Sequence, residues 1–178
     1  MAGIVESIRA EYERYKALAE GAFAQVNDAE LSAPGPNDGS SIAIVSWHIA
    51  GNLRSRFTDF LTADGEKPWR QREEEFQPRV VTKAELAETW SRGWDALFGA
   101  LSGLTDRDLD RTVTIRRQPL TVAEALHRSL AHTSYHVGQI VYLAKSIRGA
   151  GWKYLSIPPG QSDAYNRAPV PTLDRPGR

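Results

Sequence analysis

Three histidines are the residues of this sequence best suited to chemistry. His132 and His136 lie four positions apart, a spacing that places both imidazoles on one face of a helix, one turn from each other. His48 lies far earlier, in Ser46-Trp-His-Ile-Ala. If the two segments are neighbouring helices, the three rings can converge inside a bundle, where sites of this kind are built. We therefore predict that His48, His132 and His136 bind one divalent metal ion.

A site with three histidine ligands leaves at least one coordination position open. Zinc would be tetrahedral with a water in the fourth position, whereas nickel, cobalt or iron would bind more waters; zinc and nickel are the ions we expect. An open position can lower the pKa of a bound water, or bind a thiol as its thiolate. Thr133 follows His132, so the glutamate of a His-Glu-x-x-His metalloprotease is missing and peptidase activity is not expected.

Two polar side chains are candidates for holding the histidines in place. Asn52 lies one helical turn beyond His48, and Gln139 lies nearly one turn beyond His136. Metal-binding histidines usually donate their second ring N–H to such an acceptor. Polar residues on a helix are nevertheless more often solvated than engaged with a metal ligand, so both assignments stay open at this point.

The charged residues near the histidines have simpler explanations. Arg54 and Arg56 could bind an anionic group of a cofactor, but a solvated helix face is the favoured interpretation. The segment Arg70-Gln-Arg-Glu-Glu-Glu75 is interpreted as a solvated loop of mixed charge, and His127 lies off the ligand face. The sequence assigns no residue as catalytic or as cofactor-binding.

Four amphipathic stretches are expected to form the helices that position the histidines. Capping boxes at Thr82-Lys-Ala-Glu85 and Thr121-Val-Ala-Glu124 mark where two of them begin. Because four helices must bury four apolar stripes, the predicted fold class is all-α, a four-helix bundle. The predicted helices span about Ile4–Val26, Ile42–Thr62, Thr82–Leu101 and Thr121–Ile147.

The segments between and after these helices are expected to be irregular. Residues 67–81 are polar, contain two prolines and predict a long crossover between helices two and three. Residues 111–116 alternate in a way that suggests a small ribbon with residues near Leu120. We assign residues 1–156 to the bundle domain and 157–178 to an extended proline-rich tail, which could fold over the metal site or over a neighbouring subunit.

The composition bounds the classes of protein to which the chain can belong. Its 178 residues suit one domain, and 22 Lys and Arg balance 22 Asp and Glu, so the basic excess of a nucleic-acid-binding protein is missing. No segment predicts a membrane span or a signal peptide, which favours the cytoplasm. Cysteine is absent; any thiol chemistry must therefore use a thiol from outside the chain.

The histidine segments resemble the DinB-like superfamily of bacterial metal-binding four-helix bundles. The resemblance covers about Ile4 to Ile147 and depends on Trp47-His48 and on His132-Thr-Ser-Tyr-His136-Val-Gly-Gln-Ile-Val141. It implies a bundle in which a long crossover joins the second and third helices, and a metal bound by His48, His132 and His136. Characterised relatives include transferases that join a low-molecular-weight thiol, such as mycothiol or bacillithiol, to electrophiles, and thiol-dependent isomerases.

The leading expectation is a metal-dependent transferase that activates a low-molecular-weight thiol for attack on an electrophile. The alternative is a non-catalytic bundle, in which the metal braces two helices or the protein senses metal or stress. Metal-assisted hydrolysis ranks last because no proton donor is recognisable. A small-molecule thiol and an electrophile are the expected partners, without nucleic acid or membrane. Apolar residues such as Phe98 and Leu104 favour a homodimer.

Overall fold

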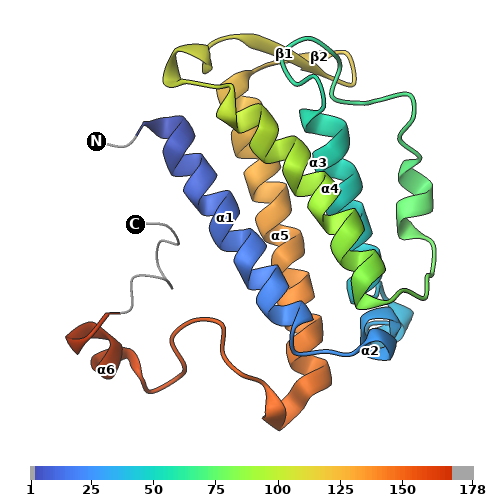
Figure 1. Ribbon diagram of the computed structural model, residues 1–178, viewed down its shortest axis with the longest axis vertical. Helices are drawn as coiled ribbons and strands as arrows, with labels where there is room; N and C mark the ends of the chain where they lie inside the picture. The colour runs from blue at the N-terminus through green and yellow to red at the C-terminus, as the bar shows by residue number, and fades with distance from the viewer. Residues whose placement is uncertain (1–2, 170–178) are drawn as a thin grey trace.

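Four long helices form the body of the computed structural model, which describes residues 3–169. They lie side by side along the length of the molecule (Figure 1), so the all-α bundle predicted from the sequence is confirmed. α3 packs against α4 and α5, and α1 packs against α5. The four helices are α1 (Ile4–Phe23), α3 (Ile42–Phe57), α4 (Lys83–Ser102) and α5 (Val122–Arg148).

The shorter elements occupy the ends of the bundle and its connections. An antiparallel pair, β1 (Thr112–Ile115) and β2 (Gln118–Thr121), forms the predicted ribbon at one end. Two further α-helices are α2 (Asp28–Ser32), at the opposite end, and α6 (Ser162–Arg167). The 3₁₀ turns are η1 (Pro36–Asp38), η2 (Arg72–Phe76), η3 (Asp106–Asp108) and η4 (Gly149–Gly151).

Side-chain caps explain where the helices begin. Both predicted capping boxes are present, at Thr82 for α4 and at Thr121 for α5, and the Ser41 hydroxyl accepts the Ile44 amide at the start of α3. A third box, Asn27-Asp-Ala-Glu30, begins the short helix α2, which the sequence analysis did not predict. Each cap satisfies amides that have no partner within the helix, which contributes about 1 kcal/mol.

Two helices are shorter than predicted. α1 ends at Phe23 rather than Val26, and α3 ends at Phe57 rather than Thr62. The backbone of Thr58 leaves the helical region, and Asp59 takes a left-handed conformation with φ 49°. The buried apolar stripe continues to Phe60 all the same. Helical spacing of apolar residues therefore overestimated the length of α3, because a turn can bury the same side chains.

The core of the bundle is apolar and rich in aromatic rings. Tyr12 and Trp94 are both fully buried and make an edge-on contact, and Trp94 also contacts the rings of Trp90 and Phe98. Such pairs add about 0.5–1.5 kcal/mol to the free energy gained from burial. Leu104, one of the apolar residues expected to be available for a partner subunit, is itself buried within the chain.

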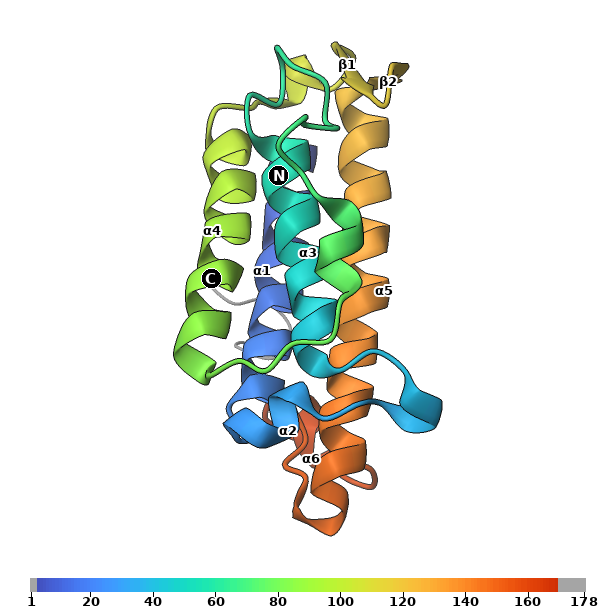
Figure 2. The same cartoon turned by 90° about the vertical axis from the view of Figure 1, so that its right-hand side faces the viewer.

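The crossover between α3 and α4 runs along the outside of the bundle rather than across its end. Figure 2 shows this segment beside α3, with η2 lying on the side of α3 that faces α5. At the end near the ribbon, the Asp64 carboxylate accepts the backbone amides of Arg116 (2.8 Å) and Arg117 (2.7 Å). These two residues form the turn between the strands, and both have positive φ, 53° and 62°. Asp64 thereby joins the crossover to the ribbon.

The chain after α5 packs on α1. The backbone amide of Lys153 donates to the side chain of Gln25 (2.8 Å), and Leu155 lies so close to Gly21 that a Cβ there would come within 2.8 Å of it. The described part of the predicted tail includes α6, and residues 170–178 lie outside the described residues. None of residues 3–169 belongs to a helix long and apolar enough to cross a membrane.

Candidate metal centre

The three predicted histidines meet between α3 and α5. His48 extends from α3, and His132 and His136 extend from one face of α5. The Nε2 atoms of His48 and His132 are 3.1 Å apart, and the ring centroids of the three residues are 4.5–5.1 Å from one another. One ring nitrogen from each histidine lies within 4.8 Å of the others. The arrangement could hold a metal ion.

The donor set and its spacing fit a divalent transition metal. Imidazole nitrogens bind zinc at about 2.0–2.1 Å, so two nitrogens on one tetrahedral ion lie about 3.3 Å apart. The 3.1 Å between His48 and His132 is close to that value. Two imidazole nitrogens facing each other can share only one proton, whereas a metal ion would satisfy the lone pairs of all three rings.

A buried carboxylate orients His48. The Nδ1 atom of His48 lies 2.9 Å from Glu75 Oε2, and both side chains are nearly inaccessible to solvent. Because an ionised carboxylate only accepts hydrogen bonds, Nδ1 carries the proton and the Nε2 lone pair faces the cluster. Glu75 therefore acts on the histidine as the acceptor that most metal-binding histidines possess.

Arg70 neutralises Glu75 through two hydrogen bonds. Its Nε lies 2.8 Å from Oε1 and its Nη2 lies 2.7 Å from Oε2, the forked pairing that guanidinium and carboxylate groups favour. Burial acts to raise the pKa of Glu75, but the hydrogen bonds from Arg70 and His48 outweigh burial and hold this pKa below its ordinary value. The carboxylate is thus charged at neutral pH. The prediction of a solvated loop is wrong for Arg70 and Glu75, whose side chains are 2% and 9% exposed.

A glycine in α3 gives Glu75 the room to reach His48. A Cβ built on Gly51 would lie 2.7 Å from Glu75 Cδ, closer than non-bonded carbon atoms approach. Any larger residue at this position would push η2 away from α3. Gly51 and Glu75 are therefore a matched pair, one on the helix and one on the crossover.

Gln139 orients His136 in a similar way. The Nδ1 atom of His136 donates to Gln139 Oε1 (2.7 Å), and the Gln139 amide donates to the Tyr135 hydroxyl (3.3 Å). Of the two acceptors whose assignment the sequence left open, Gln139 does hydrogen-bond a histidine. Asn52, the other candidate, lines a cavity next to the cluster instead.

Burial keeps the two histidines of α5 neutral. Burial and then the neighbouring charges of His136 and His48 lower the pKa of His132 to about 4. The pKa of His136 is also lowered, chiefly by burial, although Gln139 acts in the opposite direction. Neutral imidazoles are the form that binds a metal, so both residues are ready to bind one at neutral pH.

Two cavities of different character open beside the histidines. One, of about 190 Å³, is lined by His48 and His132 and by arginines from several elements. The other, of about 530 Å³, is lined by His48 and His136 and largely by apolar and aromatic residues. Its aromatic and apolar lining includes Val45, Phe76, Tyr135, Tyr142 and Leu143. His48 lies between the two cavities.

Comparison with known proteins places the chain in a family. The family model described as "Protein of unknown function (DUF1572)" matches residues 2–161. This chain belongs to the DUF1572 family. The crystal structure of a conserved protein from Enterococcus faecalis has the same fold, with a TM-score of 0.64, 18% identity, and coverage of 84% of this chain and 99% of that one. No curated protein matches the sequence.

The remaining sequence predictions around the site have mixed outcomes in this DUF1572 protein. His127 is exposed and stays away from the cluster, as expected. Arg54 is exposed and stacks on Trp69, 4.5 Å from the ring centroid. Arg56, however, is only 11% exposed and lines the smaller cavity, so a solvated helix face is the wrong interpretation for it.

Glu75 and Arg70 are the functional candidates that sequence reasoning missed. They lie in a crossover without periodic apolar residues, so nothing local marked them as buried. The available signal was composition: Phe76 follows directly after a run of three glutamates and packs on His48 with ring centroids 4.5 Å apart. An aromatic residue in a polar connection indicates where that connection touches the bundle.

Proposed function

We propose that His48, His132 and His136 bind one divalent metal ion, zinc or nickel, and that the centre activates a low-molecular-weight thiol for attack on an electrophile. The observation that carries the proposal is the meeting of three imidazoles, two of them oriented by hydrogen bonds, at the junction of two cavities. The resemblance of the histidine segments to the DinB-like superfamily supports it. A bound ion would favour the thiolate form of the thiol.

The chain's own residues would supply orientation and a dry environment. Glu75 and Gln139 hold the outer nitrogens of two histidines, so the inner lone pairs are arranged before any ligand arrives. The larger cavity offers Phe76, Tyr135 and Tyr142 as surfaces for an apolar electrophile. In the reaction the thiol would lose its proton, and its sulfur would form a bond to the electrophilic carbon while a leaving group departs or a double bond takes up a proton.

A non-catalytic metal site is the second candidate. Its supporting observation is that the histidines come from two helices and that Glu75 connects His48 to the crossover. One ion could therefore brace α3, α5 and η2 together. A structural ion raises the unfolding temperature strongly, because its binding free energy becomes folding free energy. Chelation of a catalytic ion from a preformed bundle lowers that temperature only modestly.

The decisive experiment measures metal and turnover in the same preparation. Elemental analysis of untagged protein should give one zinc or nickel per chain, and a variant with all three histidines changed to alanine should give none. The loaded protein should consume bacillithiol or mycothiol when monochlorobimane is present, and the triple variant should not. Stoichiometric metal without turnover of any thiol would exclude the transferase and favour the non-catalytic metal site. Metal retained by the triple variant would refute both candidate functions.

A further inference from the structure

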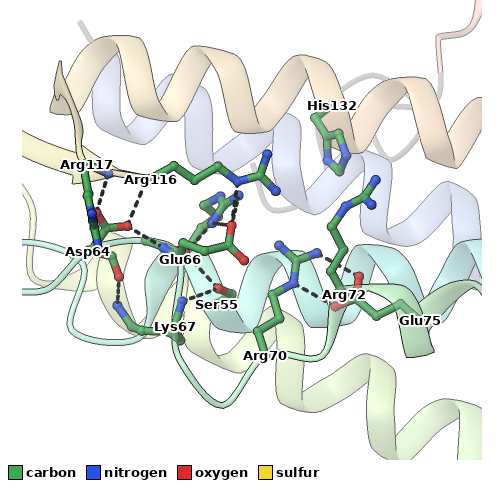
Figure 3. Close-up of polar contacts among 12 residues, drawn as sticks. Ser55, Asp64, Glu66, Lys67, Arg70, Arg72, Glu75, Arg116, Arg117 and His132 are labelled. Atoms are coloured by element: carbon green, nitrogen blue, oxygen red, sulfur yellow. Dashed lines mark hydrogen bonds and ion pairs between the residues drawn. The ribbon is translucent and has the colours of Figure 1, made fainter.

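The smaller cavity beside His132 carries a concentration of positive charge. Five of its twelve lining residues are arginines and none is acidic. The arginines come from α3, the crossover, the ribbon and α5. In Figure 3 the guanidinium groups of the three that are labelled point toward the same space beside His132. The five are Arg56, Arg70, Arg72, Arg116 and Arg128.

Two of these arginines share one carboxylate. Glu66 Oε2 lies 2.8 Å from Nε of Arg116 and 3.2 Å from Nη2 of Arg56. Burial, and then the charge of Arg70, hold the pKa of Arg56 below its ordinary value although Glu66 acts in the opposite direction. Guanidinium groups stay protonated in proteins despite such shifts. This side of the cavity therefore has more positive than negative charge.

The other arginines leave donors free on the opposite side. Arg70 Nη1 is buried without a hydrogen-bond partner, although the same guanidinium binds Glu75 through its other nitrogens. Arg72 and Arg128 are exposed to solvent. Among residues 3–169, Arg72 forms an ion pair with the exposed Glu73 alone and stacks on Phe76, and Arg128 forms no ion pair. A buried donor without a partner has lost its water and gained nothing in exchange, which is unfavourable. An oxygen in the cavity would relieve that cost.

The shape and chemistry of the cavity suit one class of ligand. Guanidinium groups bind carboxylates and phosphates in a fork, through parallel charge-assisted hydrogen bonds. A cavity of about 190 Å³ holds a single group of that size with a short connection. His48 and His132 also line this cavity. The rest of a ligand whose anionic group is bound by the arginines would therefore reach the histidine cluster.

We propose that this arginine cavity is an oxyanion subsite, which binds the carboxylate or phosphate of a small ligand whose other end lies at the histidine centre. The anion binding itself requires no metal. The second part of this proposal, that the ligand extends to the histidine centre, rests on the proposed function, because the oxyanion would then belong to the thiol or to the electrophile used there. A ligand held at both ends would be oriented before it reacts.

The first experiment tests anion binding on the metal-free full-length protein. Isothermal titration with inorganic phosphate and with succinate, at constant ionic strength, should show saturable binding of at least one of them at one site per chain. Arg128→Gln and Arg72→Gln should each weaken that binding tenfold or more. Arg92→Gln is the matched control, since Arg92 pairs with Glu88 on the exposed face of α4, and it should bind like the wild type. Unchanged melting temperatures establish that the variants fold.

The outcomes separate this inference from the proposed function. Binding of phosphate alone or of succinate alone would identify which oxyanion the subsite takes, whereas no saturable binding of either would overturn the subsite. Equal weakening in Arg92→Gln would overturn it as well, because the effect would then be general electrostatics. In metal-loaded protein, Arg128→Gln should raise the KM for the thiol or the electrophile at least tenfold without loss of metal. If the anions bind but no thiol is consumed, the proposed transferase function is refuted and the oxyanion subsite is retained.

Discussion

The two sides of this bundle differ in the side chains that they bury. Where α1 and α4 meet, the interior is made of rings, and even the indole nitrogens of Trp90 and Trp94 are buried without hydrogen-bond partners. Where α3 and α5 meet, the interior contains a carboxylate, a guanidinium and three imidazoles. The aromatic interior stabilises the fold because apolar surface is removed from water. The polar interior positions charged groups beside the imidazoles, and the desolvation of these groups opposes folding. Stability and chemistry are thus assigned to different helix pairs.

The largest effect should come from the aromatic side. Trp94→Ala removes a fully buried indole that contacts three other rings, so the free energy of unfolding should fall by about 3–5 kcal/mol. Urea denaturation measures this loss. Metal affinity of the folded fraction should stay within about twofold of wild type, since sites without shared contacts act independently. A larger loss of affinity would contradict the division between the two sides.

A smaller and more specific effect is expected where the crossover touches α3. Gly51→Ala places a methyl group against Glu75, and such overpacking should destabilise the protein by about 1–3 kcal/mol and weaken metal binding. Gly99→Ala is the matched control, because a Cβ at this helical position meets nothing within 4 Å. It should instead stabilise the protein by about 0.5–1 kcal/mol. Thermal melting and a zinc titration of both variants provide the test.

Glu75→Gln should separate orientation of His48 from packing. The amide keeps the shape of the side chain but loses the charge that Arg70 and His48 share. Loss of an acceptor behind a metal-binding histidine typically costs about 10–100-fold in affinity, which competition with a chromogenic chelator would report. Glu74→Gln changes an exposed neighbour and should bind metal normally. Equal affinities in the two variants would mean that Glu75 does not position the ligand.

The smallest effect is a dependence of stability on pH in the metal-free protein. Because the pKa of His132 is lowered to about 4 from 6.5, the folded chain keeps this ring neutral in a range where the unfolded chain binds a proton. Stability should therefore decrease as the pH falls from about 6.5 toward 4, the sign expected when the unfolded state holds more protons. His136, whose pKa is also lowered, adds in the same direction.

Urea midpoints at pH 7 and pH 5 would measure this dependence. The difference between the two midpoints should shrink in His132→Asn and stay unchanged in His127→Asn, which alters an exposed histidine of the same helix. An unchanged difference in His132→Asn would show that the ring is not buried in its neutral form.

Periodicity and capping made most of the bundle predictable. Thr82 and Thr121 begin their helices as expected, and the i, i+4 pair of His132 and His136 needed only a helix to point inward. The convergence with His48 depended on the assumption that the two helices are neighbours, and the structure does bring the three histidines together. Glu75 was out of reach, since the burial of a loop residue depends on contacts with distant segments rather than on local pattern. The arginine cavity could not be predicted for the same reason, because its five arginines come from four separate elements that line one cavity only after folding.

The two-residue turn between the strands has a consequence for the evolution of this protein in the laboratory. Turns with positive φ at both central positions favour Asn-Gly, whereas this chain places Arg116 and Arg117 there and stabilises them through Asp64. Left-handed backbone at a residue other than glycine costs on the order of 1 kcal/mol. A library selected only for heat resistance should therefore replace this arginine pair early, and the selected variants would lose Arg116 from the lining of the smaller cavity while gaining a few degrees in Tm.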